Sequence, residues 1–95
     1  MIFNKEIEWD AEKNERLKSE RDLSFEEIVA ALLDGKLLDV VDHPSRNNQQ
    51  IIVVEVNGYA VFVPFVSDES KIFLKTAYKN SQATKKHLKG SKNEH

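Results

Sequence analysis

Residues 50–66 read QIIVVEVNGYAVFVPFV, two runs rich in β-branched and aromatic residues on either side of Asn57-Gly58. This dipeptide accepts the positive φ angles of a type I′ turn, so the pattern predicts a tight β-hairpin. Both faces of the first arm are largely apolar, which is typical of a central strand. In the second arm Pro64 has no N–H to donate, which predicts an edge, a bulge or a ladder break beside it. The expected faces of the first arm are Ile52, Val54 and Val56 against Ile51, Val53 and Glu55.

Further strands are predicted on both sides of the hairpin. Residues 37–42 precede it, separated from it by a loop that begins His43-Pro44. Residues 72–78 follow it as a third long strand. Because side chains alternate along a strand, we expect Phe73, Lys75, Ala77 and Lys79 on one face, and Ile72, Leu74, Thr76 and Tyr78 on the other. Lys75 and Lys79 should therefore emerge side by side.

The N-terminal third predicts a short strand and two helices. Residues 6–10 alternate apolar and acidic side chains, and Asp10 is placed to cap a helix from Ala11 to about Arg21. Its polar face is expected to be solvated and holds Lys13, Asn14, Arg16, Lys18 and Arg21. Ser24-Phe25-Glu26-Glu27 is a capping box that starts the second helix, and Gly35 follows its end. The apolar stripe expected to pack on the sheet comprises Phe25, Ile28, Val29, Leu32 and Leu33.

A last helix is predicted from Gln82 to Lys89, with Ser81 as its N-cap and Gly90 at its end. The expected order is therefore strand, helix, helix, antiparallel β-meander and C-terminal helix. This order indicates an α+β fold with the first two helices on one sheet face and the other face partly open. We expect one domain over residues 1–90 and a disordered tail over residues 91–95.

Composition limits the classes of protein that the chain can represent. It has 95 residues, no cysteine and a formal net charge of -2, so disulfides and thiolate metal sites are excluded. Without a signal-like segment or an apolar run of ~20 residues, we expect a cytoplasmic protein that does not cross a membrane. The charge is unevenly distributed, since residues 70–93 carry seven lysines and no acid. This segment can attract polyanions; the alternative is a solvated, lysine-rich tail.

The opening motifs resemble those of BrnT-like toxins. These motifs are Glu8-Trp9-Asp10, Lys13-Asn14, Leu17-Lys18 and Ser24-Phe25-Glu26-Glu27, with Asp42-His43 and Ala83-Thr84-Lys85-Lys86 following in the corresponding order. The resemblance implies a RelE-like fold and the toxin half of a bacterial type II toxin–antitoxin pair. It implies a metal-independent endoribonuclease that needs no cofactor and halts translation. Its partners would be RNA and a cognate antitoxin, often of ribbon-helix-helix type, through which the complex reaches operator DNA.

RNA cleavage of this kind needs a base, an acid and cations beside the phosphate. His43 can serve as base or acid at neutral pH, or it is an ordinary loop histidine beside a proline. Arg46 can hold a phosphate through its planar fork, or it is solvated. Lys75 and Lys79 would stabilise charge on the phosphoryl oxygens, and the alternative is a charged strand face that only aids solubility. These four residues are the candidate catalytic set.

Five further residues are candidates for RNA binding: Lys13, Lys18, Tyr78, Lys85 and Lys86. Tyr78 is a stacking candidate because it lies near the lysines, whereas Trp9 is expected to anchor the core. The resemblance also exposes a difference, because the family's arginines in the last strand and helix are lysines here. This difference motivates the alternative function, a non-catalytic module of the same fold that binds an antitoxin-like partner. A direct DNA-binding function has less support because no helix-turn-helix or ribbon arm is recognisable.

Overall fold

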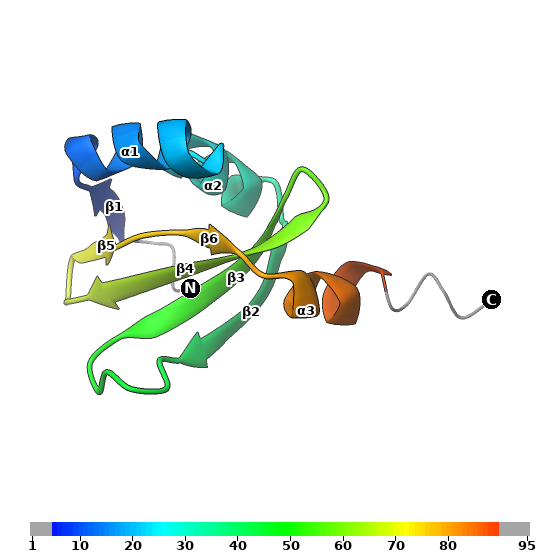
Figure 1. Cartoon of the computed structure of the whole chain (residues 1–95). Coiled ribbons are helices and arrows are strands. Elements are labelled where there is room, and N and C mark those ends of the chain that lie inside the picture. The colour runs from blue at the N-terminus through cyan, green and yellow to red at the C-terminus, as the bar shows by residue number, and fades with distance from the viewer. Residues whose placement is uncertain (1–4, 90–95) are drawn as a thin grey trace.

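The computed structural model describes residues 5–89 and has an α+β architecture with a mixed sheet. Two helices lie on one side of the sheet, and the C-terminal helical segment lies at one end of its other side (Figure 1). The elements are β1 (Glu6–Trp9), α1 (Ala11–Arg21), α2 (Phe25–Leu33), β2 (Leu37–Asp42), β3 (Gln50–Val56), β4 (Tyr59–Ser67), β5 (Lys71–Leu74), β6 (Tyr78–Lys79), α3 (Ser81–Thr84) and the π-helical segment η2 (Lys85–Lys89). Within the described range, no helix is both long and apolar enough to cross a membrane.

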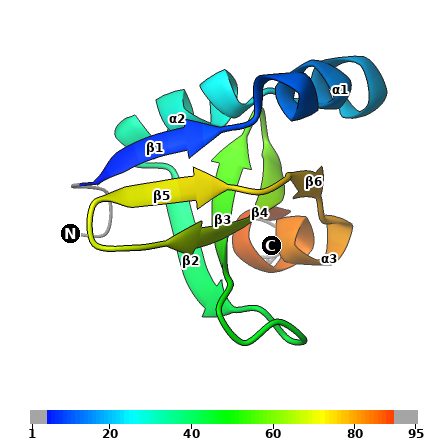
Figure 2. The same cartoon turned by 90° about the vertical axis from the view of Figure 1, so that its left-hand side faces the viewer.

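The sheet has the strand order β1-β5-β4-β3-β2, and β6 also pairs with β4. Strands β2, β3, β4 and β5 follow one another as an antiparallel meander, as the sequence predicts. The first strand then lies parallel to β5, with Ile7 opposite Ile72 (Figure 2). This one parallel pairing makes the sheet mixed.

The hairpin of β3 and β4 is the centre of the sheet and confirms the prediction from its sequence. Asn57 and Gly58 have φ angles of 54° and 86°, the two positive values that a type I′ turn requires. Strand β3 pairs with β2 on one side and β4 on the other. Its two faces divide as expected, because Ile52, Val54 and Val56 belong to the main core while Val53 belongs to a smaller cluster on the opposite face.

Helices α1 and α2 cover the main core. Asp10 caps α1 by accepting from the N–H groups of Glu12 and Lys13, and Ser24 caps α2 by accepting from the N–H of Glu27. Phe25 is fully buried, and its ring lies 5.6 Å from that of Trp9, which confirms Trp9 as a core anchor. The prediction that the whole apolar stripe packs on the sheet was wrong for Leu33. This side chain is 84% exposed, since α2 ends there.

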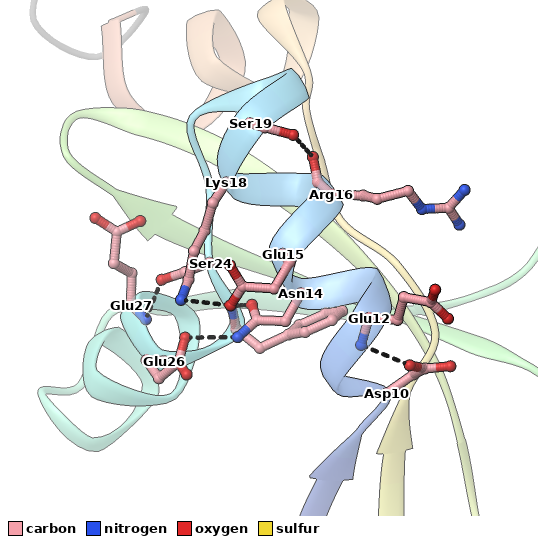
Figure 3. Close-up of polar contacts among 11 residues, drawn as sticks. Asp10, Glu12, Asn14, Glu15, Arg16, Lys18, Ser19, Ser24, Glu26 and Glu27 are labelled. Atoms are coloured by element: carbon pink, nitrogen blue, oxygen red, sulfur yellow. Dashed lines mark hydrogen bonds and ion pairs between the residues drawn. The ribbon is translucent and has the colours of Figure 1, made fainter.

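Asn14 corrects the expectation that the whole polar face of α1 is solvated. Its side chain is buried, with 3% of its surface exposed. The amide nitrogen donates to Oε1 of Glu26 at 2.8 Å, and the amide oxygen accepts from the N–H of Phe25 at 2.8 Å (Figure 3). Asn14 therefore joins α1 to the first turn of α2 and satisfies a helix-terminal N–H that has no partner within its own helix.

Among the described residues, the opposite face of the sheet is covered only at one end. There Ala83 of α3 packs with Val53, Ala60 and Phe62. The N-cap of α3 is Asn80 rather than the predicted Ser81, because the Asn80 side chain accepts from the N–H of Ala83 at 2.8 Å. The predicted stop at Gly90 and the predicted tail over residues 91–95 lie outside the described residues.

The predicted third long strand is interrupted. Strand β5 ends at Leu74 and β6 begins at Tyr78, and the intervening Lys75 donates its N–H to the carbonyl of Pro64 at 2.8 Å. Pro64 has no N–H to return, so the ladder breaks beside it. The break was one of the outcomes expected from this proline. After it, Ala77 rather than Thr76 enters the core and is fully buried.

Candidate functional site

The loop between β2 and β3 meets the break between β5 and β6 on the uncovered part of the sheet. Together they surround an open hollow of about 490 Å³. The loop contributes His43, Arg46 and Gln49, β4 contributes Pro64, the break contributes Lys75 and Thr76, and β6 contributes Tyr78. We call this the cationic hollow. Three of the four candidate catalytic residues and the stacking candidate therefore meet in one place.

His43 is held in one orientation by its own loop. Its Nδ1 atom accepts hydrogen bonds from the backbone N–H groups of Ser45, at 3.1 Å, and Arg46, at 3.2 Å. Because Nδ1 acts as an acceptor, the ring hydrogen of the neutral imidazole lies on Nε2. Nε2 can therefore donate a hydrogen bond to an oxygen of a ligand, which suits phosphate binding better than proton abstraction. From the sequence, His43 was expected to act as a base or an acid.

Lys75 and Tyr78 form the other side of the cationic hollow. The Lys75 side chain is exposed, and its Nζ atom lies 5.6 Å from the centre of the Phe73 ring. The Tyr78 ring is half-buried against Phe62, with ring centres 5.7 Å apart. An exposed ammonium group beside an anchored aromatic ring provides a cation for a phosphate and a face for a base.

Lys79 is separated from Lys75, which corrects the prediction that the two emerge side by side. Lys79 pairs with Val61, a core residue beneath the helices, whereas Tyr78 pairs with Phe62 on the other face. The Lys79 Nζ atom lies 5.2 Å from the centre of the Tyr59 ring, and Lys79 does not line the cationic hollow. The cause is the interruption beside Pro64, which changes the alternation of side chains between Lys75 and Lys79.

The remaining lysines of the predicted binding set lie elsewhere. Neither Lys13 nor Lys18 lines the cationic hollow. Lys18 pairs with Glu15 at 3.1 Å (Figure 3), and this hydrogen bond and the charge of Glu15 raise the pKa of Lys18. Lys86 lines a second hollow beside α3, whereas the exposed Lys85 lines neither hollow.

Arg21 is a supporting residue that the sequence did not reveal. Its Nη1 atom donates to the carbonyl of Ala77 at 2.8 Å and lies 3.5 Å from the hydroxyl of Thr76. Both partners belong to the break between β5 and β6, so Arg21 holds the segment that presents Lys75. The contact forms between the end of α1 and the broken strand, which are far apart in the sequence. Helix periodicity alone therefore could not indicate that Arg21 contacts this strand.

The chemistry of the cationic hollow favours an anionic ligand. Its lining residues include an arginine, a lysine and a histidine that can donate from Nε2, but no aspartate or glutamate. In contrast, the chain as a whole carries a net charge of -2. Arginine binds phosphate oxygens through a planar fork, and lysine adds a compact point charge. The arrangement is therefore suited to a phosphodiester group.

Comparisons with known proteins add no family assignment. Searches of protein-family models, curated proteins and solved structures found no match to this chain. The geometry of the cationic hollow and the resemblance of the opening motifs are therefore the observations that bear on function.

Proposed function

We propose that the chain binds RNA through the cationic hollow and acts as an endoribonuclease toxin of RelE-like fold, restrained by a cognate antitoxin. The observation that supports this proposal is the convergence of His43, Arg46 and Lys75 around a space without an acidic side chain. Tyr78 adds an aromatic face beside these cations. Binding of operator DNA would then depend on the antitoxin rather than on this chain.

In the proposed reaction Arg46 and Lys75 hold the non-bridging oxygens of one phosphate. The neighbouring 2′-hydroxyl gives its proton to water as its oxygen attacks the phosphorus, the bond to the 5′ oxygen breaks to leave a 2′,3′-cyclic phosphate, and the released 5′ oxygen takes a proton from water. Charge accumulates on the non-bridging oxygens that the two cations face. The Nε2–H of His43 can donate a hydrogen bond to one of these oxygens. The RNA supplies its own nucleophile, so positioning and charge stabilisation are the main tasks of the protein.

Expression without an antitoxin tests this proposal, and the two separated lysines provide a matched pair. We expect the unmodified chain to arrest growth and degrade RNA. Lys75→Ala should relieve the arrest and weaken RNA binding about tenfold, the effect of losing ~1.4 kcal/mol of interaction. Lys79→Ala removes the same charge from the opposite face and should retain the arrest. Normal growth with intact RNA in cells that contain the unmodified chain would refute nuclease action.

One observation favours a second candidate, a module of the same fold that binds without cleaving. Nδ1 of His43 is occupied by backbone N–H groups, and no carboxylate lines the cationic hollow to take its place as a base. On this view the hollow holds an anionic segment of a protein partner. A stable complex with the antitoxin, together with RNA that stays intact at every protein concentration, would support this candidate over the first.

A further inference from the structure

A second hollow lies on the same face of the sheet, between β2 and the C-terminal helical segment. Its volume is about 330 Å³, near the lower end of the range of about 300 to 1,000 Å³ for ligand pockets. Val41, Val53, Phe62 and Ala83 give it an apolar floor. Asp39 and Lys86 add charges of opposite sign, and Gln82 adds an amide.

The two hollows meet at a pair of aromatic rings. Tyr78 lines the cationic hollow and Phe62 lines the second hollow. Their ring centres are 5.7 Å apart, with planes inclined by 48°. A ligand that leaves one hollow along this face therefore reaches the other across an aromatic ridge, and aromatic rings are the usual platform for bases of a single strand.

The chemistry of the second hollow differs from that of the first. The Oδ1 atom of Asp39 accepts from the backbone N–H of Val40 at 2.8 Å, and Asp39 is exposed. A carboxylate repels a phosphate but accepts hydrogen bonds from amino groups, such as N4 of cytosine. The apolar floor suits the face of a base, and Lys86 suits the phosphate that follows it. The lining of the second hollow therefore suits a nucleobase, whereas the lining of the cationic hollow suits a phosphate.

We infer that the second hollow is a base-recognition subsite for the same RNA strand whose phosphate occupies the cationic hollow. This inference rests on the proposed RNA-binding function and specifies its substrate. The substrate is single-stranded RNA that crosses the Tyr78–Phe62 ridge and places a base with an amino group against Asp39. Duplex RNA does not satisfy this arrangement, because paired bases are stacked and their amino groups are occupied.

Fluorescence anisotropy with labelled 2′-O-methyl oligoribonucleotides tests the inference without cleavage, because these probes lack the nucleophile. A cytidine dinucleotide reports on the cationic hollow, and a cytidine hexanucleotide reaches both hollows. Lys86→Ala should weaken hexanucleotide binding about three- to tenfold and leave dinucleotide binding unchanged. Lys85→Ala is the matched control, since Lys85 lies next to Lys86 in the chain but lines neither hollow; it should change hexanucleotide binding less than twofold.

A second comparison addresses the base itself. The cytidine hexanucleotide should bind more tightly than the uridine hexanucleotide, which has no amino group, and Asp39→Asn should abolish this preference. Equal effects of Lys85→Ala and Lys86→Ala, or equal binding of the two hexanucleotides by the unmodified chain, would overturn the inference while leaving the phosphate site intact. Failure of the unmodified chain to bind any of the probes would overturn the proposed RNA-binding function as well.

Discussion

At the scale of single residues, several polar side chains in this chain stabilise structure that other residues use. Asn14 joins two helices, Asn80 caps the C-terminal helix, and Arg21 holds the carbonyl of Ala77. Each of these side chains hydrogen-bonds a group at a helix end or at a strand break. Composition alone would assign all three residues to the solvated surface.

Arg21→Ala should disturb the cationic hollow more than it disturbs the fold. Arg21 is exposed, so the loss of its hydrogen bond to Ala77 should cost only about 0.5 to 1 kcal/mol of unfolding free energy. RNA affinity should fall about threefold or more, because Lys75 loses its support. Arg16→Ala, another exposed arginine of α1, is the control for both measurements, namely thermal unfolding and anisotropy. Equal RNA affinities of the two variants would contradict a supporting role for Arg21.

The contact between Glu26 and Asn14 predicts a specific acid sensitivity. The hydrogen bond from Asn14 is the largest of the effects that lower the pKa of Glu26. The contact therefore stabilises the fold above the ordinary glutamate pKa of about 4.3, and this stabilisation is lost as the pH falls through the lowered value. Thermal unfolding should show a smaller decrease between about pH 6 and pH 3 for Glu26→Gln than for the unmodified chain. Glu27→Gln removes the same charge and leaves the Asn14 contact in place, so its acid response should resemble that of the unmodified chain.

At the scale of elements, the sequence predicted the structure correctly wherever a segment determines its own conformation. The Asn57-Gly58 turn, the Ser24 cap and the division of β3 between two cores all follow from spacing and turn chemistry. The prediction of a third long strand was wrong, because the strand breaks beside Pro64, a residue of the neighbouring strand. The same dependence separates Lys75 from Lys79, so alternation within one strand could not predict the site.

Gly58→Ala tests how strongly the central turn constrains the sheet. Gly58 has a φ angle of 86°, and a Cβ atom added there would meet no heavy atom within 4 Å. The cost should therefore come from the backbone alone, about 1 to 2 kcal/mol of unfolding free energy. Gly35→Ala, with a φ angle of 79° and similarly open space, should cost a comparable amount in chemical denaturation. An unchanged midpoint for both variants would show that neither position needs glycine.

At the scale of the whole molecule, charge is separated in a way that the net value of -2 conceals. The cationic hollow lies on the part of the sheet that α1 and α2 leave uncovered and has no acidic lining residue, while residues 1–45 carry 12 acidic and six basic side chains. This separation lets a polyanion approach one face although the chain as a whole is acidic. Periodicity predicted the uncovered face, but the meeting of the His43 loop with the strand break required three-dimensional structure.

The small number of phosphate contacts predicts a weak salt dependence of binding to the cationic hollow. For the cytidine dinucleotide, whose single phosphate Arg46 and Lys75 share, the logarithm of the association constant should fall with the logarithm of salt concentration with a slope of about -0.7. Lys75→Ala should make this slope shallower, because Arg46 alone then faces that phosphate. An unchanged slope after this substitution would show that Lys75 makes no phosphate contact.

The parallel pairing of β1 with β5 has a consequence for biosynthesis. Strand β1 can pair with the sheet only after its partner, Lys71–Leu74, has been synthesised. Ribosomes add about 5 to 20 residues per second. For several seconds, then, the nascent chain carries Leu17, Phe25 and Ile28 without the strands that bury them. A chaperone or a protease can act on the nascent chain during this interval. A transcript truncated before β5 yields a chain in which β1 has no partner strand.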